Sequence, residues 1–222
     1  MKIAIDGPSG AGKSSVSKAV ASKLGIIYVD TGALYRTIGY YVKEHNISPK
    51  DKDAVIAQLP NIKLEIKYEN GSQAVYLNGT NPGDAIRQPE ISMYASAVSA
   101  ISEVRTFLLD TQRDIARHNS VIMDGRDIGT VILPDAEVKI FLTASLENRA
   151  HRRFDELRAK GISANFEDVM REMRERDNND AGRDVAPAIA APDAIILDNT
   201  GFTVEQSVDA VIKIINDRLA TV

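Results

Sequence analysis

The sequence predicts an α/β protein with a doubly wound, parallel, five-stranded sheet and a small antiparallel β-meander inserted into it. Two observations carry this prediction. Short apolar runs alternate five times with segments of helical periodicity, and they are as continuously apolar as buried parallel strands. Between residues 62 and 68 apolar and polar residues alternate instead, and Asn-Gly pairs follow at 70–71 and 78–79, as in hairpins. The expected core strands are 2–6, 26–30, 121–124, 138–143 and 194–198.

Helices fill the segments between these strands. Thr31 is expected to cap one of them, Pro89 to open another, and Thr203 with Gln206 has the spacing of a capping box. The meander is expected to interrupt the core, which gives a core domain of residues 1–46 and 100–222 and an inserted subdomain of residues 47–99. The expected helices are 14–24, 31–41, 104–118, 146–160, 166–176 and 203–219.

Composition excludes several classes of protein. Of the 222 residues, 44% are hydrophobic and 26% charged, which suits a globular domain, and there is no cysteine for disulfides or thiolate metal sites. A net charge of −4 argues against nucleic-acid binding. An acid at Asp6 interrupts any signal peptide, and no apolar run approaches the roughly 20 residues of a membrane span. A cytoplasmic protein with no membrane or nucleic-acid partner is therefore expected.

The strongest motif is a glycine-rich loop between a strand and a helix, Gly7-Pro8-Ser9-Gly10-Ala11-Gly12-Lys13-Ser14, followed by Ser15. It matches the P-loop pattern, in which backbone N–H groups cradle phosphates. Lys13 is then expected to reach the β- and γ-phosphates of ATP, and the Ser14 hydroxyl to bind Mg²⁺. The alternative is an ordinary glycine turn, which the strand and helix around the motif disfavour.

Two absent sequence features and the many arginines narrow the class of reaction. The guanine-binding tetrapeptide of GTPases, Asn-Lys-x-Asp, is absent, and no device for positioning water is evident. A kinase whose acceptor is itself a phosphate needs no general base, since that phosphate is largely ionised at pH 7, but it needs cations to align two polyanions. Arginines are frequent between Arg149 and Arg183, where a solvated, salt-bridged helical face is the alternative reading.

Several further motifs together resemble the bacterial cytidylate kinases, a family of nucleoside monophosphate kinases. The resemblance runs from Ile3 to the final helix and implies phosphoryl transfer from ATP to the small molecules CMP and dCMP, with the insertion as the nucleoside-monophosphate-binding part. The motifs are residues 5–13, Asp30-Thr31-Gly32-Ala33-Leu34-Tyr35-Arg36, Asp124-Gly125-Arg126-Asp127-Ile128-Gly129-Thr130, Ala150-His151-Arg152-Arg153 and Val185-Ala186-Pro187.

For the acceptor nucleotide, the resemblance implies that Thr31, Tyr35 and Arg36 bind it, with Arg36 on its phosphate. It further implies that Ser96, Arg105 and Asp127 read cytosine, a carboxylate accepting from its amino group. Read alone, Tyr35 is as readily a core aromatic and Ser96 a small residue on a helix face. Residues Asp124, Arg126, Arg176, Asp180 and Arg183 complete the implied substrate set.

For catalysis, the resemblance implies that Lys13, Arg126, Arg152 and Arg183 stabilise the transferring phosphoryl group. A short helical lid over about 149–183 is implied, with Arg153 on ATP and with Arg149, Arg152 and Arg153 on one helical face. Asp124 resembles a Walker-B carboxylate, although a strand-end turn carboxylate is an equal alternative. His151 is expected to be structural.

Two alternatives remain open at this point. Another P-loop kinase of a small molecule, such as a uridylate, adenylate or shikimate kinase, would share the loop and the arginines but not the cytosine readers. A nucleotide-binding regulatory module would keep the loop without needing Arg36, Arg126, Arg152 and Arg183. The stretch 176–183 also has fewer arginines than the family pattern. All expected site residues lie in one chain, which favours a monomer.

Overall fold

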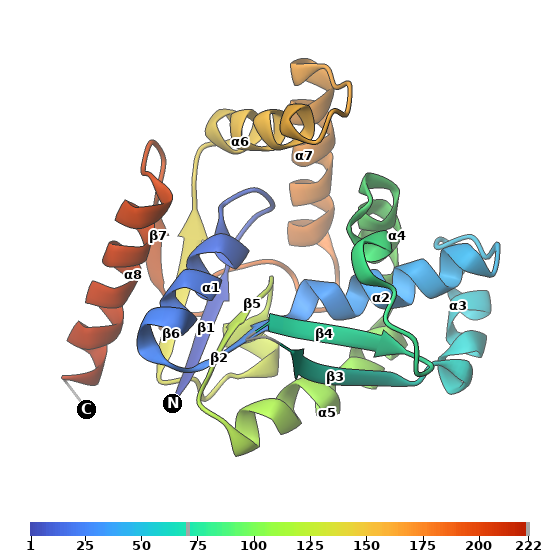
Figure 1. The fold of residues 1–222 in the computed structure, drawn as a ribbon, viewed down its shortest axis with the longest axis horizontal. Coiled ribbons are helices and arrows are strands. Elements are labelled where there is room, and N and C mark those ends of the chain that lie inside the picture. The colour runs from blue at the N-terminus through green and yellow to red at the C-terminus, as the bar shows by residue number, and fades with distance from the viewer. Residues whose placement is uncertain (70–71, 221–222) are drawn as a thin grey trace. The chain divides into compact units, whose positions relative to one another are not determined.

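The structure is a computed structural model that describes residues 1–69 and 72–220. The chain divides into two compact units. The first contains residues 1–27 and 119–222, and the second contains residues 28–118. Figure 1 follows the chain through both units by colour. No helix of the described residues is long and apolar enough to cross a membrane.

Five strands form one sheet in the order β2-β5-β1-β6-β7. Its central strand β1 pairs in parallel with β5 on one side and with β6 on the other, and β6 pairs in parallel with β7. The buried faces of β1 and β5 explain their unbroken apolar sequences. The predicted five-stranded parallel sheet is confirmed. Its strands are β1 (Lys2–Asp6), β2 (Ile27–Asp30), β5 (Val121–Asp124), β6 (Val138–Thr143) and β7 (Ile195–Asp198).

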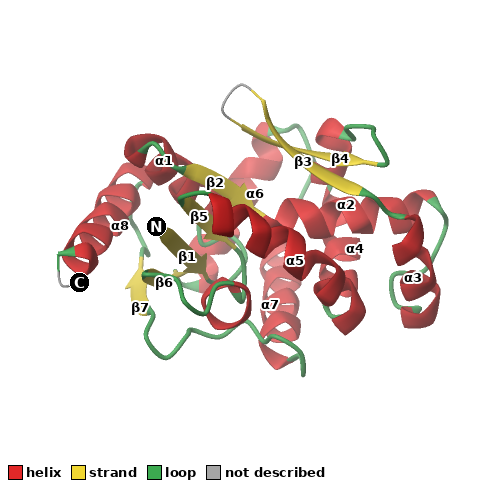
Figure 2. Ribbon diagram, turned by 90° about the horizontal axis from the view of Figure 1, so that it is seen from below, coloured by secondary structure: helices red, strands yellow, loops and turns green. Residues whose placement is uncertain are grey.

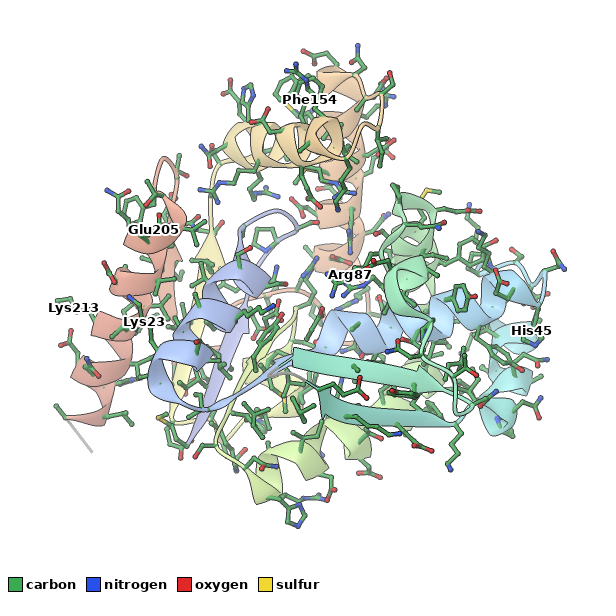
Figure 3. The ribbon with its side chains drawn as sticks, in the orientation of Figure 1. Lys23, His45, Arg87, Phe154, Glu205 and Lys213 are labelled. Carbon is green, nitrogen blue, oxygen red and sulfur yellow. The ribbon has the colours of Figure 1, made fainter. Side chains whose placement is uncertain are left out.

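The helices of the first unit form two pairs. In one pair α1 packs beside α8, as both views show, and the predicted capping box of Thr203 and Gln206 opens α8. In the other pair α6 and α7 share a small apolar core, to which Phe154 contributes from α6 (Figure 3). His151 stacks on Phe166 there, in keeping with a structural role. The bounds are α1 (Lys13–Leu24), α6 (Leu146–Ala159), α7 (Phe166–Gly182) and α8 (Val204–Leu219).

The second unit packs its helices around their own apolar cluster, and a two-stranded antiparallel hairpin joins them (Figure 2). Pro89 opens a helix as predicted. The hairpin turn predicted at Asn70-Gly71 lies outside the described residues. The bounds are α2 (Thr31–Glu44), α3 (Lys52–Gln58), β3 (Leu64–Glu69), β4 (Ser72–Leu77), α4 (Pro89–Ser99) and α5 (Ser102–His118).

Three local predictions need correction. Asp30 rather than Thr31 caps α2, because its side chain accepts a hydrogen bond from Ala33 N while Thr31 is already helical. The predicted meander is a hairpin: around Asn78 and Gly79, both with positive φ, the described residues form a single bridge between Leu77 and Thr80 and no third strand. The short helix α3 was not predicted, although Asp51 caps it in the ordinary way.

Asp6, at the end of β1, holds a π-helical turn (Ile128–Ile132) beside the sheet. Its two carboxylate oxygens accept hydrogen bonds from Ile128 N at 2.7 Å and Gly129 N at 2.8 Å. Burial raises the pKa of Asp6 from its ordinary 3.8 to about 6, against the lowering effect of these hydrogen bonds. The folded state therefore binds this proton more tightly than the unfolded chain, and the stability that the protonated group contributes is lost as pH rises from about 4 to 6.

We predict that Asp6→Asn removes this pH dependence. The unfolding free energy of the wild type, minus that of the variant, should fall by about 2 kcal/mol between pH 4 and pH 7. Urea unfolding across this range measures the difference, with Asp209→Asn on an exposed carboxylate as the control. A difference that rises with pH would contradict the assignment.

Candidate active site

The P-loop joins β1 to α1 (Figure 1), and α1 begins at Lys13. Lys13 is buried and its Nζ donates to the carbonyl oxygen of Pro8 at 2.7 Å, inside the loop. Burial, and then the nearby charge of Arg126, lower the pKa of Lys13 well below its ordinary value, whereas the carboxylate of Asp124 raises it. The loop therefore carries a fixed amino group at the N-terminus of a helix, where phosphate binding is favoured.

A hydroxyl and a carboxylate meet beside this lysine. The Ser14 hydroxyl donates to Asp124 Oδ2 at 2.8 Å, and Asp124 ends β5 in register with Ile5 of β1. Both side chains thus lie at the carboxyl edge of the sheet, where ligands of open α/β folds bind. Oxygen ligands of this kind suit Mg²⁺. The predicted Ser14 and Asp124 positions are thus brought together by the structure.

A second group of charges lies where the end of α7 meets the segment after β5. Arg126 Nε donates to Asp180 Oδ2 at 2.8 Å, and Arg183 lies 4.0 Å from the other Asp180 oxygen and 3.9 Å from Asp127. Burial raises the pKa of Asp180, but the charges of Arg126, Arg176 and Arg183 outweigh it and hold that pKa below its ordinary value. Asp180 is therefore an ionised anchor for arginines.

The tip of the P-loop is held by three side chains of α6 and α7, which we call the Ser9 clamp: Arg149, Arg176 and Asp177. Arg149 Nη1 donates to Ser9 O at 2.9 Å, and Asp177 accepts from Ser9 N at 3.3 Å. Arg176 Nη1 lies 3.4 Å from the Ser9 hydroxyl. Arg149 and Asp177 also form an ion pair of 2.5 Å, so the backbone of Ser9 is bound by a closed ring of hydrogen bonds.

Gly10 makes this approach possible. A Cβ at this position would lie 2.6 Å from Met173 Cε and 3.2 Å from Arg149 Cβ, and the φ of +75° is one that other residues rarely adopt. Sequence reasoning did not single out Asp177. Its only signal is its place directly after Arg176, and the contact to Ser9 spans 168 residues.

Arg152 anchors the other side of the loop. Its guanidinium donates to Asn199 O at 3.0 Å and to Ala11 O at 3.4 Å. Asn199 is buried, follows β7, and links Ala11 O to Ser207 of α8 through its side-chain amide. Asn199 was also missed by sequence reasoning. Arg153, one residue further along α6, instead pairs with Glu156 on its own helix.

The second unit contains its own set of predicted residues. Arg105 is buried, donates to Ser99 O at 3.1 Å, and lies 5.5 Å above the ring of Tyr35. The Ser99 hydroxyl in turn donates to the carbonyl oxygen of Ser96 at 2.8 Å, so Arg105 is linked through Ser99 to the backbone of Ser96. Tyr35 is also part of the apolar cluster, which agrees with the reading of this aromatic as a core residue.

Arg36 and Thr31 lie at the start of α2. Arg36 Nη2 donates to Asp30 Oδ2 at 2.7 Å, and Thr31 is buried. The predicted residues thus fall into two groups. Thr31, Tyr35, Arg36, Ser96 and Arg105 belong to the second unit, and all the others belong to the first.

Comparisons with known proteins give one consistent result. A family model described as cytidylate kinase matches residues 3–217. The chain is 49% identical over 214 residues to a cytidylate kinase of Caldicellulosiruptor bescii, covering 96% of this chain and 95% of that protein. It is 46% identical over 217 residues to a cytidylate kinase of Fervidobacterium nodosum, covering 98% of this chain and 97% of that protein.

Among solved structures, an uncharacterized protein from Eubacterium ventriosum aligns with a TM-score of 0.57 and 14% sequence identity. The alignment covers 98% of each chain. At this identity the likeness concerns the fold alone.

We predict that Asp177→Ala destabilises the protein by about 2–3 kcal/mol, because it leaves the buried guanidinium of Arg149 without its carboxylate. Chemical denaturation measures the change. Asp168→Ala is the matched control, since Asp168 pairs with Arg171 on the exposed side of the same helix and should change stability by less than about 0.5 kcal/mol. Equal effects of the two substitutions would show that the Ser9 clamp does not stabilise the loop.

Proposed function

The chain belongs to the cytidylate kinase family, and we propose that it transfers the γ-phosphoryl group of ATP to CMP and dCMP, giving ADP and CDP or dCDP. The observation that carries the proposal is the match of this family along nearly the whole chain, which includes a P-loop with a buried lysine. The named relatives are cytidylate kinases, and the P-loop chemistry of the first unit is what such a reaction requires.

ATP is proposed to bind along the P-loop, residues 7–15, with its β- and γ-phosphates near Lys13. Ser14 and Asp124 would hold Mg²⁺, Asp124 through water. Their hydrogen-bonded oxygens at the carboxyl edge of the sheet support this assignment. Mg²⁺, when bound, neutralises charge on the phosphates and orients them. Arg153 is proposed to contact ATP as well, after exchanging its partner Glu156.

In the proposed reaction, an oxygen of the CMP phosphate attacks the γ-phosphorus of ATP. The attack is in line with the bond between the γ-phosphorus and the β-phosphate oxygen. That bond breaks, and ADP is the leaving group. The acceptor phosphate has a second pKa of about 6, so it is already a nucleophile at pH 7 and needs no general base. Stabilisation of charge is then the main requirement. Lys13, Arg126, Arg152 and Arg183 are proposed to supply it, and the fixed partners of these four cations support that role.

Acceptor recognition is proposed to depend on three sets of residues. The nucleotide would be bound by Thr31, Tyr35 and Arg36, with Arg36 on its phosphate. The cytosine base would be read by Ser96, Arg105 and Asp127. The ribose and phosphate would be bound by Arg176, Asp180 and Arg183. Support comes from the contacts that hold Arg105 over Tyr35 and Arg36 beside Asp30. Uracil would present a carbonyl to the carboxylate of Asp127, and an unpaired buried polar group costs roughly 1–3 kcal/mol.

We propose that residues 1–46 and 100–222 act as the catalytic core, residues 47–99 as the nucleoside-monophosphate-binding insertion, and residues 149–183 as a lid that excludes water. We also propose that the protein acts in the cytoplasm as a monomer, since one chain supplies every proposed site residue. The Ser9 clamp, which joins α6 and α7 to the P-loop, supports the lid assignment.

The proposal is tested by measuring ADP release with Mg·ATP and a panel of CMP, dCMP, UMP, AMP and GMP. CMP and dCMP should be turned over at least about tenfold more efficiently than the other nucleotides, as expected for one mismatched polar group in the base site. Preference for another nucleotide would keep the kinase and reject the three base readers. Binding of ATP with no transfer to any acceptor would reject the enzyme and favour a regulatory module.

We predict that Lys13→Ala lowers kcat with ATP and CMP by about 100-fold or more, because it removes a cation fixed beside the transferring phosphoryl group. Steady-state kinetics measures the loss, and thermal unfolding verifies that the variant is folded. Lys18→Ala, an exposed lysine of the same helix, is the control and should leave kcat unchanged. Turnover near that of the wild type in Lys13→Ala would refute the role of this lysine.

A further inference from the structure

Asp30 is a junction at which the end of β2 meets the start of α2. Its Oδ1 accepts from Ala33 N at 2.9 Å and caps the helix, while its Oδ2 pairs with Arg36 Nη2 at 2.7 Å. Both oxygens of one carboxylate are therefore committed, one to the backbone of α2 and one to the guanidinium proposed to bind the acceptor phosphate. The orientation of Arg36 depends on where Asp30 is held.

Gln73, on strand β4 of the inserted hairpin, holds Asp30 through its backbone. The side-chain oxygen of Gln73 accepts from Asp30 N at 2.9 Å, and its amide nitrogen donates to Asp30 O at 3.1 Å. The two hydrogen bonds fix both polar groups of one residue, as a neighbouring strand would do. They join segments 43 positions apart in the chain.

The position of Gln73 in the hairpin is unusual for a polar residue. Side chains alternate along a strand, so Gln73 shares a face with Val75 and Leu77, both of which pack on the apolar cluster of the second unit. The apolar face anchors the hairpin (β3 and β4 in Figure 2), and Gln73 places a carboxamide at one end of that face. Its pairing with Asp30 explains why a polar side chain stands there.

The guanidinium of Arg36 has little freedom beside Asp30. A Cβ on Gly32 would lie 3.0 Å from Arg36 Nη1 and 3.2 Å from Asp30 Oδ1, so a larger residue there would displace one of these two groups by a few tenths of an ångström. Among the residues that the structure describes, no group accepts a hydrogen bond from the buried Nε of Arg36. The ion pair with Asp30 therefore fixes one nitrogen of the fork.

We propose that Gln73 is a positioning residue for the acceptor phosphate, acting through Asp30 on Arg36, and that this is one task of the inserted hairpin. The proposal rests on the proposed function, in which Arg36 binds that phosphate. Without Gln73, the Asp30 backbone can rotate and the Arg36 fork is no longer held in one orientation. Binding of the acceptor then has to order the Arg36 side chain, which lowers the affinity for the acceptor but not the affinity for ATP.

The test compares Gln73→Met, which keeps the length and volume of the side chain but removes both hydrogen bonds, with Gln88→Met. Gln88 is an exposed glutamine of the same unit. Gln73→Met should raise the KM for CMP by about fivefold to tenfold while the KM for ATP changes by less than about twofold. Gln88→Met should change neither constant.

A double-mutant cycle with Arg36→Ala separates positioning from general loss of structure. If Gln73 acts through Arg36, Gln73→Met should have no further effect on the KM for CMP in the Arg36→Ala background. Equal effects in both backgrounds, or an equal rise of both KM values, would overturn the proposal. If thermal unfolding shows that Gln73→Met does not fold, Gln73→Glu replaces it in the test. A glutamate can accept from Asp30 N but cannot donate to Asp30 O. This variant should give the same selective rise in the KM for CMP.

The wild type distinguishes this proposal from the proposed function. Absence of wild-type turnover with CMP would reject the function itself. Normal wild-type turnover, together with an unchanged KM for CMP in Gln73→Met, would reject only the role of Gln73.

Discussion

Burial of positive charge around the P-loop is the constraint on which the first unit depends. Lys13 and Arg149 are buried, and a buried charge without a partner costs several kcal/mol. The chain meets this cost locally, with the Pro8 carbonyl on Lys13 and Asp177 on Arg149. These partners come from the loop itself and from α7, so the same contacts that neutralise the cations also fix the loop. The cations that phosphate would meet are therefore positioned by the protein itself.

The second unit also holds its arginines in place through contacts within the unit. Arg105 is held by a backbone carbonyl and an aromatic ring, and Arg36 by Asp30, which the hairpin secures through Gln73. Arginine carries much rotamer freedom, and binding must pay for ordering it. Holding each guanidinium in advance reduces that cost. The hairpin thus supports a side chain of α2 through Asp30.

Sequence reasoning succeeded where the signal is local. The P-loop, the five strands and the capping box of α8 depend on neighbouring residues, and each was found. The roles of Asp177, Asn199 and Gln73 depend on partners 168, 188 and 43 positions away, which no spacing rule contains. The cap of α2 shows a finer limit: Asp30 and Thr31 are both good capping residues, and only the backbone conformation decides between them.

Two buried aspartates of the first unit show how surroundings assign different tasks to one side chain. Asp6 is buried and accepts hydrogen bonds from two backbone N–H groups, and burial raises its pKa to about 6. Burial also raises the pKa of Asp180, but three nearby arginines outweigh this effect and hold that pKa below its ordinary value. A carboxylate that must neutralise guanidinium groups has to stay charged, whereas one that only orients a turn can bind a proton without losing both hydrogen bonds. Arg176 and Arg183 therefore help to keep Asp180 ionised, and Asp180 in turn holds Arg126 in place.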